Sequence, residues 1–183
     1  MGYYTPELRA RLSADGKMLI AFIGVERFCQ QQQIHHSELD ALINHAWTCL
    51  TMGNSSEQWD AWEAGFHREK IDPMDDVYPD DFLQSMPEDS KIDLENLLNH
   101  CVEITAVGWG GEAYERSERH FEKAIAILEK HHIPLPDIEP FIRVLPRYYY
   151  RKHRPVMSAE QAQDFRQYVS TTVSADQQGC EPQ

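Results

Sequence analysis

Apolar residues recur at spacings of three and four along most of the chain, and this periodicity predicts helices. In residues 37–50, for example, Leu39, Ile43 and Leu50 share one face behind Ser37, which we expect to be the N-cap. No stretch of useful length alternates between apolar and polar positions as a half-buried strand does. The pattern therefore predicts an all-α fold, a single-domain irregular bundle of six to seven helices.

The same periodicity, together with residues that start or stop helices, sets the other predicted boundaries. Pro6 suits the first turn of a short N-terminal helix, and the Asp15-Gly16 dipeptide predicts the turn that ends it. Ser158 and Gln161 have the spacing of a capping box. The remaining helices are predicted at residues 18–29, 57–70, 91–105, 112–131, 139–145 and 158–169.

Two tryptophans and three cysteines fall on the apolar faces of these helices. Trp59 and Trp62 belong to one helix and are expected to pack inward, as are Cys29, Cys49 and Cys101. The four cysteines of the chain lie far apart without a C-x-x-C pair, which favours a reducing compartment over a disulfide scaffold or a zinc ribbon.

The chain carries no sign of export or membrane insertion. Its start, MGYYTPELRARL, has no apolar core of the kind that secretory signals contain. The longest apolar run, residues 18–25, is far shorter than the roughly twenty residues of a membrane span. We expect a cytoplasmic protein with one helical domain over residues 1–170 and a flexible tail over 171–183.

Negative charge is concentrated in the middle of the chain. Residues 57–95 hold thirteen Asp and Glu against three Lys and Arg, which gives −10 of the whole chain's −13. Pro73, Pro79 and Pro87 predict that residues 71–90 are irregular, with one short helix at 79–86. Net charge of this sign argues against general binding to nucleic acid and favours a basic partner.

Within this segment, residues 72–89 form what we name the acidic loop. Its acids come in doublets spaced by proline and by large apolar residues, an arrangement that costs stability through repulsion and offers apolar anchors. We expect carboxylates to steer a partner and aromatic rings, with an exposed Trp109, to hold it. The predicted partner-binding residues are Asp72, Asp75, Asp76, Tyr78, Asp80, Asp81, Phe82, Glu88, Asp89 and Trp109.

A metal-dependent enzyme, a hydrolase or an oxidase, is the main alternative. It would bring His100, Glu103, Glu129 and His132 together between two neighbouring helices. Ferritin-like di-iron bundles need a Glu-x-x-His motif on each of two helices, and the chain has one, Glu129 with His132. A calcium loop and the H-E-x-x-H zinc motif are both absent from the sequence. The main hypothesis therefore includes neither a cofactor nor a catalytic residue.

One basic cluster, residues 147–154, alternates four Lys and Arg with three tyrosines and a histidine. It fits internal pairing with the acidic loop or with the C-terminal carboxylates better than nucleic-acid binding. Head-to-tail self-association of the basic and acidic patches is a third hypothesis for this cluster, and a homodimer is a further expected form.

An acidic, cysteine-poor helical chain of this size resembles, at the level of class, the immunity proteins that neutralise toxins of bacterial contact-dependent, Rhs and type VI systems. The helix order, with residues 25–28 early and 72–82 in mid-chain, is also similar to an uncharacterised bacterial helical family, which implies no activity. The resemblance implies a cytoplasmic protein that binds a basic toxin, such as a nuclease. A helical interaction module of another role is a third hypothesis.

Overall fold

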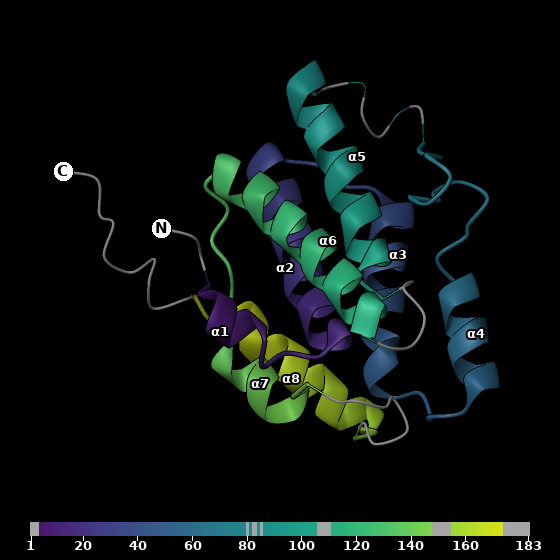
Figure 1. The fold of residues 1–183 in the computed structure, drawn as a ribbon. Helices are drawn as coiled ribbons and strands as arrows, with labels where there is room; N and C mark the ends of the chain where they lie inside the picture. Colours follow the sequence, from purple (N-terminus) through teal and green to yellow (C-terminus); the bar gives the residue numbers. More distant parts are fainter. Residues whose placement is uncertain are drawn as a thin grey trace.

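The computed structural model describes residues 4–79, 81, 84, 86–105, 111–147 and 155–173. Across these residues the chain forms eight α-helices and one short 3-10 helix, and no strands, which confirms the predicted all-α class. Figure 1 shows their arrangement. The helices are α1 (Pro6–Arg9), α2 (Ala14–Gln32), α3 (Ser37–Trp47), η1 (Thr48–Leu50), α4 (Ser56–Ala64), α5 (Glu88–Glu103), α6 (Gly111–Lys130), α7 (Glu139–Val144) and α8 (Ala159–Ser170).

Helix α2 is the central element, with buried residues on every face and contacts to α3, α5 and α6. The turn predicted at Asp15-Gly16 is wrong, because both residues lie in the first turn of α2. Ser13 is the N-cap, and its Oγ accepts the backbone N–H of Gly16 at 3.1 Å. Asp15 adds a negative charge at the positive end of the helix. The Asp-Gly pair is therefore accommodated by a cap that lies just before it.

Helices α5 and α6 run antiparallel and side by side across α2 (Figure 1). The predicted apolar stripes are confirmed, since Leu97 and Cys101 on α5, and Phe121 and Leu128 on α6, are fully buried. The α2 backbone approaches α6 closely at Gly24, where an added Cβ would lie only 2.3 Å from Leu128 Cδ1.

Helix α4 places Trp59 and Trp62 in the core, at 1% and 4% exposure, as predicted. It ends at Ala64 rather than near Lys70, because the next residue, Gly65, caps it and its carbonyl accepts a hydrogen bond from Arg68 Nε at 3.1 Å.

The predicted N-cap of α3 is also shifted by one residue. His36 holds that position, and its Nδ1 accepts the N–H of Glu38 at 3.2 Å, while Ser37 is the first helical residue.

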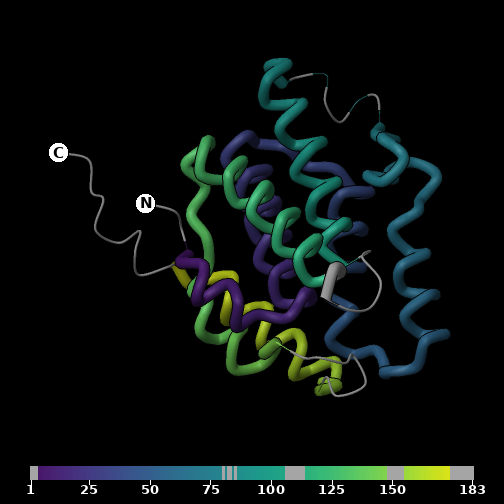
Figure 2. Tube along the Cα trace, viewed as in Figure 1, coloured from purple at the N-terminus to yellow at the C-terminus, as the bar shows by residue number. Residues whose placement is uncertain are grey.

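The C-terminal helices pack below this bundle, with α7 and α8 beside α1 (Figure 2). The rings of Phe141 on α7 and Phe165 on α8 make an edge contact at 5.3 Å between centroids. The predicted capping box of α8 is present. Arg166 on α8 binds Glu26 at 2.5 Å, and Arg27 donates to the carbonyl of Thr172 at 2.7 Å. Contacts to the core thus continue through the first residues of the expected tail, and residues 174–183 lie outside the described part of the chain.

Three cysteines are buried, as predicted, and form no disulfide within the described part of the chain: Cys29, Cys49 and Cys101. Burial, with smaller contributions from Asp40 and Glu26, raises the pKa of Cys29 to about 12, and burial also raises the pKa of Cys101. These thiols serve as small core side chains. Among the described helices, none combines enough length with enough apolar character to cross a membrane.

Candidate functional site

The acidic loop begins with a closed turn, and its shape depends on Asp72. The backbone of Asp72 exchanges two hydrogen bonds with Val77, at 2.8 and 2.9 Å. The Asp72 side chain is buried, and its Oδ1 accepts the N–H groups of Met74 at 3.0 Å and Asp75 at 3.4 Å. Asp76 has a φ of 54°, the left-handed conformation that aspartate tolerates better than most residues. One buried carboxylate therefore organises residues 72–77.

Two further hydrogen bonds fix this turn to helix α5. Asn99 Nδ2 donates to the carbonyl of Pro73 at 2.8 Å, and the Tyr78 hydroxyl donates to the carbonyl of Glu95 at 3.1 Å. Burial, reinforced by the nearby Asp76 and Glu95 carboxylates, raises the pKa of Tyr78, so its hydroxyl remains a donor. The turn is thus attached to the core at both of its ends.

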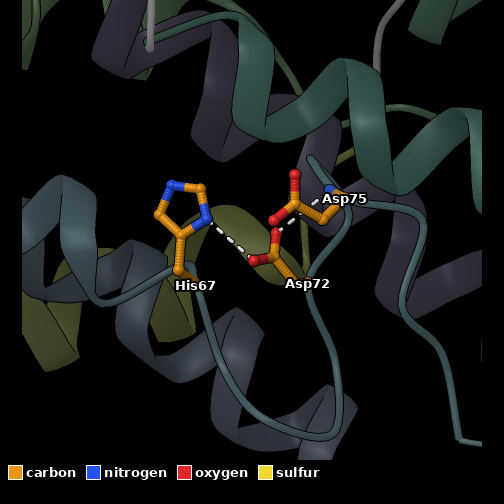
Figure 3. A group of neighbouring side chains, drawn as sticks. All are labelled: His67, Asp72 and Asp75. Carbon is orange, nitrogen blue, oxygen red and sulfur yellow. Dashed lines mark hydrogen bonds and ion pairs between the residues drawn. The ribbon is translucent and has the colours of Figure 1, made fainter.

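Figure 3 shows a cluster at the base of the turn, formed by His67, Asp72 and Asp75. His67 Nδ1 lies 2.7 Å from Asp72 Oδ2, and one ligand atom of each residue lies within 4.8 Å of the others. An imidazole and two carboxylates are groups that bind divalent metals. Both oxygens of Asp72, however, already accept hydrogen bonds, from the turn backbone and from His67. The cluster therefore serves to stabilise the turn through the hydrogen bonds of Asp72.

The predicted partner-binding residues divide by exposure. Asp75, Asp76, Asp81, Glu88 and Asp89 are exposed to solvent. Asp72 and Tyr78 have structural partners, since Asp72 is 6% exposed and Tyr78 is half-buried against α5. Asp80, Phe82 and Trp109 lie outside the described residues. The first five are therefore the predicted partner-binding carboxylates that reach solvent.

A groove of about 430 Å³ lies beside the turn, where the loop passes the start of α3. We name it the α3 groove. Its lining comes from the start of α3 and from two neighbouring segments that lie about thirty and forty residues further along the chain: His36, Ser37, Glu38, Glu69, Lys70, Val77, Tyr78, Pro79 and Asp81. The Lys70 ammonium and the Glu38 carboxylate form an ion pair along it at 3.7 Å, and the His36 ring contacts the Asp81 carboxylate at 3.6 Å.

Sequence reasoning identified Tyr78 and Asp81 of this groove but missed most of its wall, including Glu38, Glu69 and Lys70. The segment around Glu38 lies some forty residues before Asp81, so no local spacing connects them. Likewise, His67 and Asp72 are five apart in a non-helical segment, a spacing with no regular meaning. The only available signal was the general excess of acids.

The alternative metal site is not assembled. At the end of α5, Glu103 pairs with Arg116 at 3.1 Å, and the His100 ring contacts that of His120 with centroids 5.2 Å apart. Burial, followed by repulsion from His120 and Lys123, lowers the pKa of His100 to about 4. This pair of predicted ligands lies beside the first half of α6.

The other two predicted ligands lie at the opposite end of the α5–α6 pair. There, Asp93 near the start of α5 contacts Lys130 and His131, each at 2.6 Å. Glu129 and His132 adjoin this contact in sequence. Because α5 and α6 are antiparallel, His100 and Glu103 are separated from Glu129 and His132 by much of the helix pair.

Of the basic cluster, Arg147 is described and residues 148–154 are not. Its guanidinium lies 3.7 Å from the centroid of the Tyr114 ring, and its backbone N–H donates to the backbone carbonyl of Arg11 at 2.8 Å. Arg147 therefore packs at the N-terminal part of α6, rather than pairing with the acidic loop.

The fold and the loop together define a helical domain that presents carboxylates on a braced turn. Comparison of the chain with protein-family models, with curated proteins and with solved structures finds no match. Function must therefore be inferred from the loop and the groove.

Proposed function

We propose that this protein is a cytoplasmic binding protein that neutralises a basic protein partner, with the role of an immunity protein toward a bacterial toxin. The observation that carries the proposal is the turn at residues 72–77. A buried carboxylate shapes it, two bonds fix it to α5, and the exposed carboxylates Asp75 and Asp76 project from it.

Exposed acids on a fixed turn favour fast and specific association with a basic surface. Complementary charge raises association rates far above those of neutral surfaces, and the effect falls steeply with ionic strength. A preformed loop also loses little conformational freedom on binding, which strengthens the complex. The two exposed carboxylates do not help this chain to fold. Asp75 and Asp76 repel each other, and neither carboxylate makes an ion pair among the described residues. A basic nuclease domain is the kind of partner that this surface suits.

The test begins with affinity capture of a partner from the native host, with particular attention to a basic toxin domain encoded by an adjacent gene. Association is then measured by stopped-flow mixing at low salt. Replacing Asp75, Asp76 and Asp81 by lysine should slow association by at least about tenfold. Relief of toxicity in cells that co-express the toxin should be lost in parallel.

A matched control reverses three exposed acids on other surfaces, Glu115 on α6 with Glu160 and Asp164 on α8. This variant has the same net charge as the loop variant, so it removes the general effect of charge. Equal rates for wild type, loop variant and control would refute the proposed binding surface. A partner whose contact surface is acidic would refute the charge argument itself.

A further inference from the structure

The α3 groove has more negative charge than its own cation can neutralise. Three carboxylates line it, from Glu38, Glu69 and Asp81, against one ammonium, from Lys70. That ammonium belongs to a side chain that is 69% exposed, and it lies 3.7 Å from the Glu38 carboxylate, so the pair is loose and open to exchange. The start of α3 contributes a partial positive charge of roughly one half, which leaves the groove clearly negative.

The same groove also offers apolar surface, from Val77, Tyr78 and Pro79. Val77 is 39% exposed, which is unusual for a large aliphatic side chain in this protein. Tyr78 is held in place by its hydrogen bond to α5. Long cationic side chains bury their aliphatic stems on such surfaces while the charged end meets polar groups, and aromatic rings attract cations.

Arginine fits this combination better than lysine. Its planar guanidinium presents several N–H donors that can bind more than one carboxylate at once, and it stacks on aromatic rings. The volume of about 430 Å³ lies within the range of roughly 300–1,000 Å³ that is typical of small-ligand sites, enough for one inserted side chain with its flanking backbone.

From these features we infer that the α3 groove is a socket for an arginine side chain of the protein partner. The arginine displaces Lys70 from Glu38 and lies among Glu38, Glu69 and Asp81, with its stem against Val77 and Tyr78. This inference rests on the proposed function and deepens it. The exposed acids of the turn steer the partner, and the groove takes one residue of it.

Two short peptides test the socket without the partner. The probes are acetyl-Gly-Arg-Gly-amide and the same peptide with citrulline, which has nearly the shape of arginine but no charge. In a titration of ¹⁵N-labelled protein followed by NMR, the arginine peptide should shift the backbone signals of Glu38, Lys70 and Val77, and the citrulline peptide should not. Equal responses to both peptides, no response, or shifts confined to another surface would overturn the inference.

Charge-neutral variants sharpen this test. Replacing Glu38 and Glu69 by glutamine should weaken binding of the arginine peptide, and Lys70→Gln should strengthen it about two- to fivefold because a competing cation is lost. The matched controls are Glu115→Gln with Glu160→Gln, and Lys123→Gln, all at exposed positions on α6 and α8. A Lys70→Gln variant that binds the peptide more weakly than wild type would contradict displacement.

The captured partner separates failure of the socket from failure of the proposed function. If the Asp75→Lys/Asp76→Lys variant associates slowly while the Glu38→Gln/Glu69→Gln variant matches wild type, the socket is wrong and the binding function stands. If the arginine peptide occupies the groove but the protein protects no cell from a basic toxin, the proposed function is wrong and the socket stands.

Discussion

Aspartates of the acidic loop have two different roles, and burial separates them. Asp72 is 6% exposed and accepts hydrogen bonds from the turn backbone, whereas Asp75 and Asp76 are exposed. A buried acceptor that loses its partners, or leaves donors unpaired, costs roughly 1–3 kcal/mol, whereas an exposed carboxylate contributes little to stability.

We therefore predict that Asp72→Ala lowers the free energy of unfolding by about 1–3 kcal/mol, because the N–H groups of Met74 and Asp75 lose their acceptor. Asp72→Asn keeps an oxygen for those donors and should lose less. Urea denaturation followed by circular dichroism measures both variants. Asp75→Ala is the control and should remain close to wild type; a loss as large as that of Asp72→Ala would show that burial is not the deciding factor.

For single residues, the sequence predicts where acidic and apolar residues are concentrated, but not which acidic residue is structural and which is exposed. Trp59 and Trp62 could be assigned to the core because their spacing matches a helix face. Asp72 could not be told from Asp75, since the hydrogen bonds that bury it depend on the folded path of the turn. The groove could not be predicted from the sequence either, because only the tertiary fold brings Glu38 and Asp81 to the same place.

At the scale of helices, periodicity predicted most elements and local capping decided their ends. Among the misplaced ends, the starts of α2 and α3 and the end of α4 have Ser13, His36 and Gly65 as caps. Helix α5 also begins at Glu88 rather than at the predicted residue 91, and α1 already ends at Arg9. A sequence offers several such residues near each boundary, and which one is used depends on small differences in hydrogen bonding. Which helices pack together is not encoded in any local pattern.

Helix packing at Gly24 gives an element-scale prediction. Alanine favours a helix by about 1 kcal/mol over glycine, but its Cβ would overlap the fully buried Leu128, and overpacking costs about 1–3 kcal/mol. We expect Gly24→Ala to lower the free energy of unfolding by up to about 2 kcal/mol.

The double variant Gly24→Ala/Leu128→Ala identifies the cause. Once the Leu128 side chain is removed, the added methyl group has room, so Gly24→Ala should become neutral or stabilising in that background. Denaturant unfolding of the four proteins completes the cycle. Additive effects of the two substitutions would place the strain elsewhere.

For the whole molecule, the main feature is a charge of −13 that is unevenly distributed along the chain. Ion pairs such as Arg9 with Glu118 and Arg166 with Glu26 connect α1 to α6 and α8 to α2. The exposed acids at the turn of the acidic loop add like-charge repulsion instead. Salt weakens both kinds of interaction, with a Debye length of about 10 Å at 0.1 M.

This balance predicts how salt affects thermal stability. Replacing Asp75 and Asp76 by asparagine removes repulsion while keeping a residue type that tolerates the left-handed backbone at position 76. The variant should melt at a higher temperature than wild type at low salt, and the difference should shrink as sodium chloride is added. Differential scanning calorimetry at several salt concentrations measures it. A difference that is independent of salt would mean that charge is not responsible.

The hydrogen bonds of Asp72, Val77 and Asn99 that fix the turn also affect how this protein can evolve. Because these hydrogen bonds set the backbone path of the turn, the exposed position 75 can accept new side chains, whereas the left-handed backbone at position 76 restricts it to residues such as Asp, Asn and Gly. An immunity protein that must keep binding a mutating toxin benefits when the residues that contact the partner differ from those that fix the turn. Its binding specificity can then change while the fold is preserved. Natural variants of this chain should then differ most at position 75 and least at Asp72, Val77 and Asn99.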